Sequence, residues 1–431
     1  MRSRALQTRR SRRILGLGIS AIVALASSAC IPEQPAPPGE TNPETTVPET
    51  TIPETTVPDT TAPATTSPTT AAPTTTAAPG GNASPTITSF TSTLSSAPAP
   101  LTTAFQWQIS DPEGAPLTCS LDYESDGIYE TNVSNCTSAS LRSKTYSTMG
   151  SRTITLRVSD GVSTSRTATV SVNVGAASAD PFGITLRYTS GLTPSQQAAF
   201  TAAAAHWAAV IKTGLAPATV NLAADWCGTG APALAGSVDD IHIDASIEPI
   251  DGVSGILGQA GPCLTRAANG LPIYGVMQFD SADIAALEAQ GALQTVILHE
   301  MGHVLGFGTV WNGSVLTGAG TSGVAFTGKV ARGAWNAIGG SGLSVPVEST
   351  GGPGTADSHW RESVFHNEIM TGYLNSGFNP LSAITIGSLA DIGYGVDLAA
   401  AEPYGSATMR SEAYSVPIDF SLQLLTPLAS Q

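Results

Sequence analysis

The feature that most constrains this chain is the segment TVILHEMGHVLGF, which holds two histidines four positions apart. Positions i and i+4 of an α-helix lie on one face, so His299 and His303 can present both imidazoles to one ion. Glu300 is one step further round the helix and can reach a water molecule on that ion. The segment is apolar and ends at Gly306, a common helix C-terminus. We therefore expect a helix over 293–305 that carries a metal site.

This pattern suits hydrolysis assisted by zinc. Zinc lowers the pKa of a bound water toward about 7, and a nearby carboxylate can pass the water's proton to a leaving amine. Two ordinary histidines on a buried helix are the alternative, but buried polar groups need partners, which a metal supplies. We expect Glu300 to be the general base and His299 and His303 to be ligands. A catalytic zinc needs three protein ligands and one open position, so a third ligand is required.

The third ligand can be sought by elimination. Many zinc sites of this kind use a histidine three residues after the glycine, but that position is Thr309. Residues 304–347 contain no Asp or Glu, which excludes a carboxylate ligand close behind the helix. The histidines further along are His359 and His366, both within TADSHWRESVFHNEIMTGYL. The residues alone leave both open, although RESVFHNE is polar enough to face solvent.

About residues 185–397 resemble the leishmanolysin family of metzincin zinc peptidases. The resemblance is carried, in order, by HEMGHVLGF, the HW pair at His359 and Trp360, NEIMTG and LSAITIGSLADIGY. It implies an α+β peptidase fold, one catalytic Zn²⁺ and a protein or peptide substrate cut by endopeptidase action. It also implies that His359 is the third zinc ligand. Met370 would form an apolar floor beneath the metal, in the turn called the Met-turn.

A β-rich region precedes this one. RTITLRVSD and TATVSVNV alternate apolar and polar residues around an Asp-Gly turn, which is typical of a hairpin. LRVSDG and ISDPEG resemble immunoglobulin-like modules of the polycystic-kidney-disease (PKD) and cadherin type. The fold class we expect is multidomain, with an all-β immunoglobulin-like sandwich at 84–178 and an α+β metzincin-type zinc peptidase domain at 182–400.

Within the β-module, DYESDG is similar to the start of a calcium loop. It places Asp122, Glu124 and Asp126 ahead of a glycine, but the twelfth loop position is Val133, where an EF-hand needs a bidentate glutamate. Ca²⁺ binding here is one expectation, and a solvated acidic hairpin is the other.

The chain also carries an export signal. Arginine-rich residues are followed by a short apolar run and small residues before Cys30, as in a bacterial lipoprotein signal at 1–30. A Pro/Thr-rich stalk, too polar to fold, follows at 31–83. We expect an extracellular protein, either secreted or attached to the cell surface by a lipid on Cys30, with a C-terminal tail at 401–431. Membrane contact is expected only through that lipid.

The four remaining cysteines indicate disulfides, since an even number outside the cell favours pairing. The simplest pairing joins neighbours, Cys119 with Cys136 and Cys227 with Cys263. Removing the signal's six arginines changes the formal charge from −15 to −21. So acidic a chain is not expected to bind nucleic acid through general electrostatics.

Two further functions stay open. The stalk and β-module would suit a surface adhesin whose metal domain is catalytically weak, and the zinc site would suit hydrolysis of cell-wall amides. We expect a monomer. For substrate recognition we expect IYGVMQFD, residues 273–280, to be a sheet edge that pairs with an extended peptide, with an internal strand as the alternative. A capping box at Thr193 and Gln196 predicts a helix that Gly214 ends.

Overall fold

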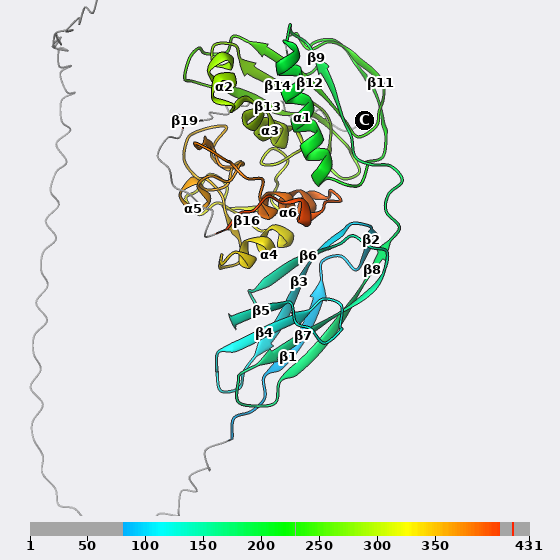
Figure 1. Cartoon of the computed structure of the whole chain (residues 1–431), viewed down its shortest axis with the longest axis vertical. Coiled ribbons are helices and arrows are strands. Elements are labelled where there is room, and N and C mark those ends of the chain that lie inside the picture. The colour runs from blue at the N-terminus through cyan, green and yellow to red at the C-terminus, as the bar shows by residue number, and fades with distance from the viewer. Residues whose placement is uncertain (1–80, 229, 406–415, 418–431) are drawn as a thin grey trace, which may run out of the picture. The chain divides into compact units, whose positions relative to one another are not determined.

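The computed structural model describes residues 81–228, 230–405 and 416–417. All of these lie in one compact unit, Thr76–Gln431 (Figure 1). The expected signal with Cys30, nearly all of the stalk and most of the C-terminal tail lie outside the described residues. Among the described residues, no helix combines the length and apolar character needed to cross a membrane.

The β-module consists of two sheets that share one core. One sheet has the order β1-β3-β6 and the other β2-β8-β7-β4-β5. Trp107, Phe105 and Leu121 are among the residues buried between them. The apolar residues of the alternating pattern that predicted strands face this core, because successive side chains of a strand point to opposite faces of the sheet. The bounds are β1 Thr86–Ser92, β2 Ser96–Pro98, β3 Leu101–Ser110, β4 Leu117–Asp122, β5 Thr131–Cys136, β6 Leu141–Tyr146, β7 Gly150–Ser159 and β8 Arg166–Gly175.

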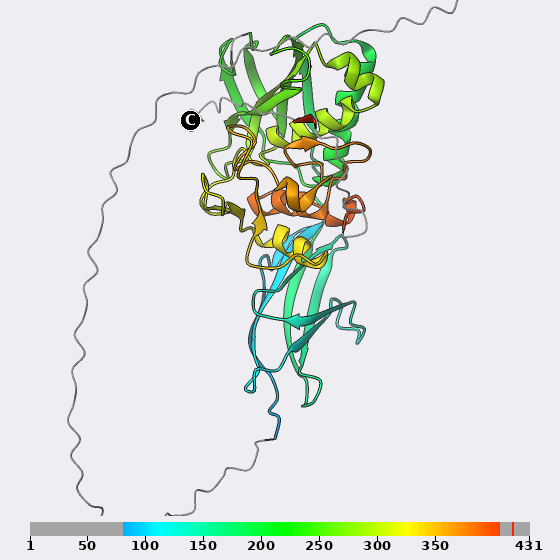
Figure 2. The same cartoon turned by 90° about the vertical axis from the view of Figure 1, so that its left-hand side faces the viewer.

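The second region, from residue 182 onward, begins with a mixed sheet of order β13-β14-β12-β9. Strands β9, β12 and β14 are parallel, and β13 is antiparallel to β14. Helices α1 and α3 pack against one face of this sheet and against each other (Figure 2). Phe200, Met277 and Phe279 are among the buried residues of this core. The bounds are β9 Ile184–Tyr188, α1 Pro194–Val210, β10 Ala218–Leu222, β11 Leu234–Val238, β12 Ile241–Glu248, β13 Gly258–Thr265, β14 Pro272–Asp280, α2 Ile284–Gln290 and α3 Leu293–Val304.

The edge-strand prediction was wrong. Residues 273–280 lie in β14, which is paired on both sides, by β12 and by β13. The strand at this edge of the sheet is β13, whose sequence GQAGPCLT contains glycine and proline and gives a weak strand signal. The capping box of α1 is present, but the helix ends at Val210, before Gly214.

The opposite face of the sheet carries the β10–β11 hairpin. The structure has a disulfide between Cys227 and Cys263 beneath this hairpin, and another between Cys119 and Cys136 in the β-module. Their Cα atoms are 5.5 and 5.9 Å apart, within the usual range.

A buried polar network also lies on this face. Asp244 accepts hydrogen bonds from Arg187 at 2.6 Å, from the Tyr274 hydroxyl at 2.7 Å and from His242 at 3.0 Å. Burial raises the pKa of Asp244, but these donors outweigh it and lower the pKa to about 2. His242 is thus a buried member of this network.

The chain between α3 and the third histidine is folded. Helix α4 and the short strands β15, β16 and β17 lie in this stretch. The remaining bounds are β15 Leu316–Thr317, β16 Ala325–Phe326, α4 Lys329–Ala337, β17 Val345–Pro346, α5 Glu362–Phe365, β18 Tyr373–Leu374, α6 Ala383–Ile392, the 3₁₀ turn η1 Leu398–Ala400 and β19 Val416–Pro417.

Helix α4 also contacts the β-module, at strand β6. The Leu141 amide donates to the Asn336 side chain at 3.0 Å, and the Ser143 hydroxyl donates to the Val330 carbonyl at 2.8 Å. A side chain at Gly333 would collide with Ser143. Because β6 lies at the end of its sheet order, α4 covers a strand edge that would otherwise offer unpaired backbone groups.

Candidate metal centre

Helix α3 presents two histidines on one face. His299 and His303 lie one turn apart and are each 1% exposed. The helix is apolar around them, with Val296, Ile297 and Met301 fully buried, so packing rather than solvent fixes its orientation. The expected helix over 293–305 is present as Leu293–Val304.

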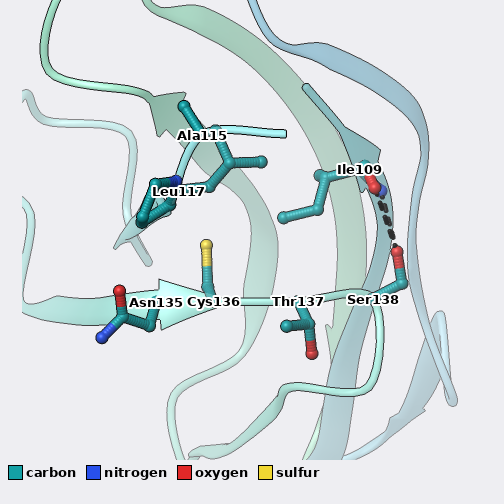
Figure 3. Close-up of a pocket in the computed structure, with 8 residues that line it drawn as sticks. Ile109, Ala115, Leu117, Asn135, Cys136, Thr137 and Ser138 are labelled. Carbon is teal, nitrogen blue, oxygen red and sulfur yellow. Dashed lines mark hydrogen bonds between the residues drawn. The ribbon is translucent and has the colours of Figure 1, made fainter. Parts of the chain in front are cut away.

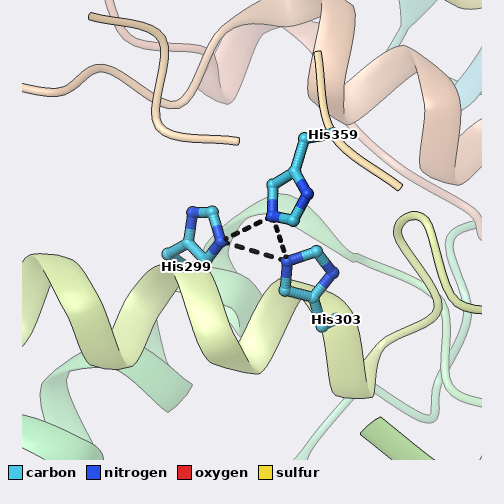
Figure 4. A group of neighbouring side chains, drawn as sticks. All are labelled: His299, His303 and His359. Atoms are coloured by element: carbon cyan, nitrogen blue, oxygen red, sulfur yellow. Dashed lines mark hydrogen bonds between the residues drawn. The ribbon is translucent and has the colours of Figure 1, made fainter. Parts of the chain in front are cut away.

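The third histidine lies in a segment whose backbone makes hydrogen bonds with two other segments of the chain. His359 is fully buried, and its carbonyl accepts the Glu348 amide at 2.8 Å. The following residue, Trp360, donates its amide to the Met370 carbonyl at 3.0 Å. Figure 4 shows His359 pointing from this segment toward the two histidines of the helix.

The three Nε2 atoms form a small triangle. His303 lies 3.0 Å from His299 and 3.0 Å from His359, and the third side measures 3.3 Å. Three nitrogens bound tetrahedrally to zinc at about 2.0–2.1 Å would lie roughly 3.3–3.4 Å apart. The triangle is therefore close to the size that one zinc ion requires.

The other ring nitrogens are oriented by backbone carbonyls. Nδ1 of His299 donates to the Ile369 carbonyl at 2.5 Å, that of His303 to Phe307 at 2.9 Å and that of His359 to Thr355 at 3.0 Å. A proton on each Nδ1 leaves the basic lone pair on Nε2, which faces the other two rings. Such an arrangement suits a shared cation.

Burial keeps these imidazoles neutral. It lowers the pKa of His303 to about 4, and it lowers the pKa values of His299 and His359 well below the usual range. Neutral imidazole is the form that binds metal, so the donor set fits zinc.

Glu300 follows His299 directly in α3 and is a buried carboxylate. It is 0% exposed, and neither oxygen makes a hydrogen bond within the described residues. Burial raises its pKa well above the usual value. Gly258, the first residue of β13, lies so close that a Cβ there would be 3.0 Å from Oε1 of Glu300. The edge strand therefore begins next to this carboxylate.

Met370 lies beneath the active-site helix. A Cβ on Gly302 would be 3.0 Å from both the sulfur and the methyl carbon of Met370. The glycine of HEMGH thus makes room for the methionine, whose side chain is 0% exposed.

The model of the family described as Peptidase_M8, leishmanolysin, matches residues 235–411. Residues 235–411 are leishmanolysin-like. The match makes the region similar to a metallopeptidase family that is zinc-dependent, and the three-histidine cluster of the structure lies within the matched residues.

Solved structures similar to the chain include two PKD domains. One belongs to an M14-like peptidase of a Thermoplasmatales archaeon, with 17% identity over 22% of this chain and 99% of that chain, at a TM-score of 0.17. The other is the PKD1 domain of Vibrio anguillarum Epp, with 19% identity over 22% of this chain and 99% of that chain, at a TM-score of 0.17. No curated protein matches the chain significantly.

The structure separates the two candidates for third ligand in the leishmanolysin-like region. His366 follows α5 at a backbone φ of 49° and does not belong to the histidine cluster. Thr309, which occupies the alternative position, donates its hydroxyl to the His303 carbonyl at 2.6 Å and so caps the end of α3. RESVFHNE was expected to face solvent, but its last two residues, Asn367 and Glu368, are buried.

Three positions that matter here escaped the sequence reasoning: Gly258, Gly302 and Glu368. The two glycines act by lacking a side chain, which can be recognised only when the neighbours are known. Glu368 lies within NEIMTG, so the motif contained the signal, but a glutamate between polar residues gave no indication of burial.

The other candidate sites lie in the β-module. Asp122 accepts hydrogen bonds from the amides of Glu124, Asp126 and Gly127, so its carboxylate organises the loop. Asp122, Glu124 and Glu130 are close enough to hold an ion, and calcium here stays a prediction.

A shallow hollow of about 440 Å³ also lies in the β-module, beside Ile109, Leu117 and Cys136 (Figure 3). No charged side chain lines it.

Proposed function

We propose that this chain is a zinc-dependent endopeptidase that hydrolyses peptide bonds of extracellular proteins. The observation that carries the proposal is the meeting of three Nε2 atoms at one point, two of them from the helix that also carries the buried Glu300. His299, His303 and His359 would hold the ion, and Met370 would lie beneath it.

A zinc ion at this position would polarise the scissile carbonyl and acidify a water molecule. Glu300 would accept the proton of the attacking water and deliver it to the leaving amine. Its burial suits this task, because a raised pKa brings a carboxylate closer to neutral pH, where it can both take and give a proton. The Nδ1 contacts keep the three rings in the ligating tautomer.

Strand β13 would bind the substrate as an added strand. It lies at the edge of the sheet and begins at Gly258, next to Glu300. An extended peptide paired with this edge would pass the carboxylate, and its scissile bond would be held by backbone hydrogen bonds.

The deciding experiment measures metal and cleavage on the same sample. Purified full-length protein should contain about one zinc per chain and should digest a peptide library, and a chelator should abolish the cleavage. Bound zinc with no peptide cleavage, together with release of cell-wall fragments, would refute the peptidase assignment. Zinc with neither activity would favour the adhesin.

We also propose export to the cell surface, with Cys30 lipidated. Mass spectrometry of the mature N-terminus checks this, since an unmodified terminus away from Cys30 contradicts it. We propose a monomer, which light scattering during size-exclusion chromatography can refute.

A further inference from the structure

Glu368 is a fully buried carboxylate two residues before Met370. Its Oε2 accepts the Met370 amide at 2.6 Å. Its Oε1 accepts the Ser382 amide at 3.2 Å, the Ser382 hydroxyl at 2.7 Å and the Thr385 hydroxyl at 2.5 Å. Four donors thus converge on one side chain that the proposed mechanism does not use.

These contacts reach His299 through a single peptide group. The amide between Ile369 and Met370 donates its N–H to Glu368, and the carbonyl of the same amide accepts Nδ1–H of His299 at 2.5 Å. A peptide unit is planar, so fixing its N–H fixes the direction of its C=O. Glu368 therefore orients the carbonyl that orients His299.

The same carboxylate reaches His359 by a second route. Thr385 donates its hydroxyl to Glu368 and accepts the indole N–H of Trp360 at 2.8 Å. Trp360 follows His359 directly and is 0% exposed. Its backbone amide also donates to the Met370 carbonyl at 3.0 Å. The two residues that accept these hydrogen bonds from Trp360, Thr385 and Met370, are also residues that donate to Glu368.

His303 is oriented by a contact that does not involve a partner of Glu368 named above. Its Nδ1 donates to Phe307, which follows the same helix, at 2.9 Å. Two of the three histidines are therefore positioned from one carboxylate, and the third from its own helix.

The surroundings favour an acceptor-only carboxylate at this position. Ser382 is the N-cap of α6 and its hydroxyl also accepts the amides of Ile384 and Thr385, so Glu368 lies at the positive end of a helix. Burial raises the pKa of Glu368 above its usual value, although the four donors offset part of this effect. A glutamine here would turn an N–H toward at least one of these donors.

We propose that Glu368 is a positioning residue of the metal centre that sets the directions of His299 and His359 through the Met-turn and Trp360. The inference rests on the proposed zinc site. It predicts that changes remote from the ion alter the strength and geometry of metal binding.

The test uses the full-length protein and compares Glu368→Gln, Thr385→Val and Thr385→Ser. Ser388→Ala is the matched control, because Ser388 is buried in α6 and donates to the Thr385 carbonyl at 2.7 Å without touching Glu368. The readouts are zinc affinity by chelator competition, the visible spectrum of the Co²⁺ form, and thermal unfolding of the metal-free protein.

Glu368→Gln should weaken zinc binding about 10–100-fold, the usual effect of losing a contact behind a metal ligand, and should change the Co²⁺ spectrum. Thr385→Val should weaken zinc binding less, because the hydrogen bond from the Met370 amide to Glu368 remains. Thr385→Ser should have wild-type zinc affinity, because it keeps the hydroxyl. Ser388→Ala should keep the affinity and spectrum even if it unfolds at a lower temperature.

Wild-type affinity and spectrum in both Glu368→Gln and Thr385→Val would overturn the inference. So would a loss of affinity in Ser388→Ala as large as in Thr385→Val, because the effect would then follow general instability. If Glu368→Gln does not fold, the Thr385→Val and Thr385→Ser pair decides, and equal affinities refute the inference. A wild-type protein that binds no zinc overturns the proposed function itself.

Discussion

The same substitution at two buried carboxylates should change stability in opposite directions. Glu300 and Glu368 are both 0% exposed, but Glu300 makes no hydrogen bond within the described residues, whereas Glu368 accepts four. In the metal-free protein, Glu300→Gln removes an ionisable group that folding places in an unfavourable environment. Glu368→Gln removes the acceptor that four donors need.

The magnitude for Glu300 follows from linkage. Burial raises its pKa above the usual 4.5, so the folded state binds its proton more tightly than the unfolded chain. The resulting loss of unfolding free energy grows as pH rises above 4.5. At pH 7 it reaches at most about 3 kcal/mol, from 1.36 kcal/mol per pH unit. Glu300→Gln should therefore stabilise the metal-free protein by about 1–3 kcal/mol at pH 7 and by almost nothing at pH 4.5.

For Glu368, leaving buried donors without their acceptor costs about 1–3 kcal/mol. Because burial raises the pKa of Glu368 as well, the loss of its charge offsets part of this cost at pH 7, so Glu368→Gln should destabilise more at pH 4.5 than at pH 7. Denaturant unfolding of the metal-free wild type and both variants, at pH 7 and pH 4.5, measures the differences. With zinc restored, Glu300→Gln should keep the metal but lose about 10²–10⁴-fold of its peptidase activity. Destabilisation by Glu300→Gln at pH 7, or retained proteolysis with stoichiometric zinc, would refute the reasoning.

Three more predictions concern the ligands and the disulfide. His359→Ala should lose most zinc and all proteolysis, whereas His366→Ala should keep the metal; dialysis followed by metal analysis checks this, and the reverse pattern contradicts it. In the metal-free Glu300→Gln protein, His303 by itself should remove about 3 kcal/mol of stability as pH falls from 6.5 to 4, because the unfolded ring binds a proton that the buried ring, with a pKa of about 4, does not. The measurement is the difference in pH dependence between this protein and the same protein with His303→Gln, and identical pH dependence contradicts the prediction. Replacing Cys227 and Cys263 by serine should lower the unfolding temperature yet leave zinc bound; zinc loss would contradict it.

The local features of the site could be predicted from the sequence. The helix of HEMGH follows from an apolar segment ending in glycine, and the spacing of His299 and His303 is a property of the helix itself. The search for a third ligand was narrowed by composition, since residues 304–347 lack acidic side chains. In both cases the prediction depends only on the residues of one continuous segment, either on those it contains or on the acidic residues that it lacks.

Features that depend on distant partners could not be predicted. Strand β13 contains Gly258 and a proline, and only its pairing with β14 makes it a strand. Glu368 looks like a surface residue because its neighbours are polar, yet Ser382 and Thr385 supply donors from a helix further along the chain. Burying a carboxylate is tolerated only when such donors exist, and a single segment does not reveal them.

The segment between α3 and His359 joins the leishmanolysin-like region to the β-module. Its helix α4 packs closely on α6, where a side chain at Gly387 would come within 2.9 Å of the Ala331 backbone. The other side of α4 meets β6 where Gly333 faces Ser143. Helix α6 in turn begins at Ser382 and carries Thr385, the two residues that bind Glu368. Contacts therefore run without a break from the β-module through α4 and α6 to the Met-turn. The β-module therefore packs on α4, which in turn packs on the helix that carries two partners of Glu368.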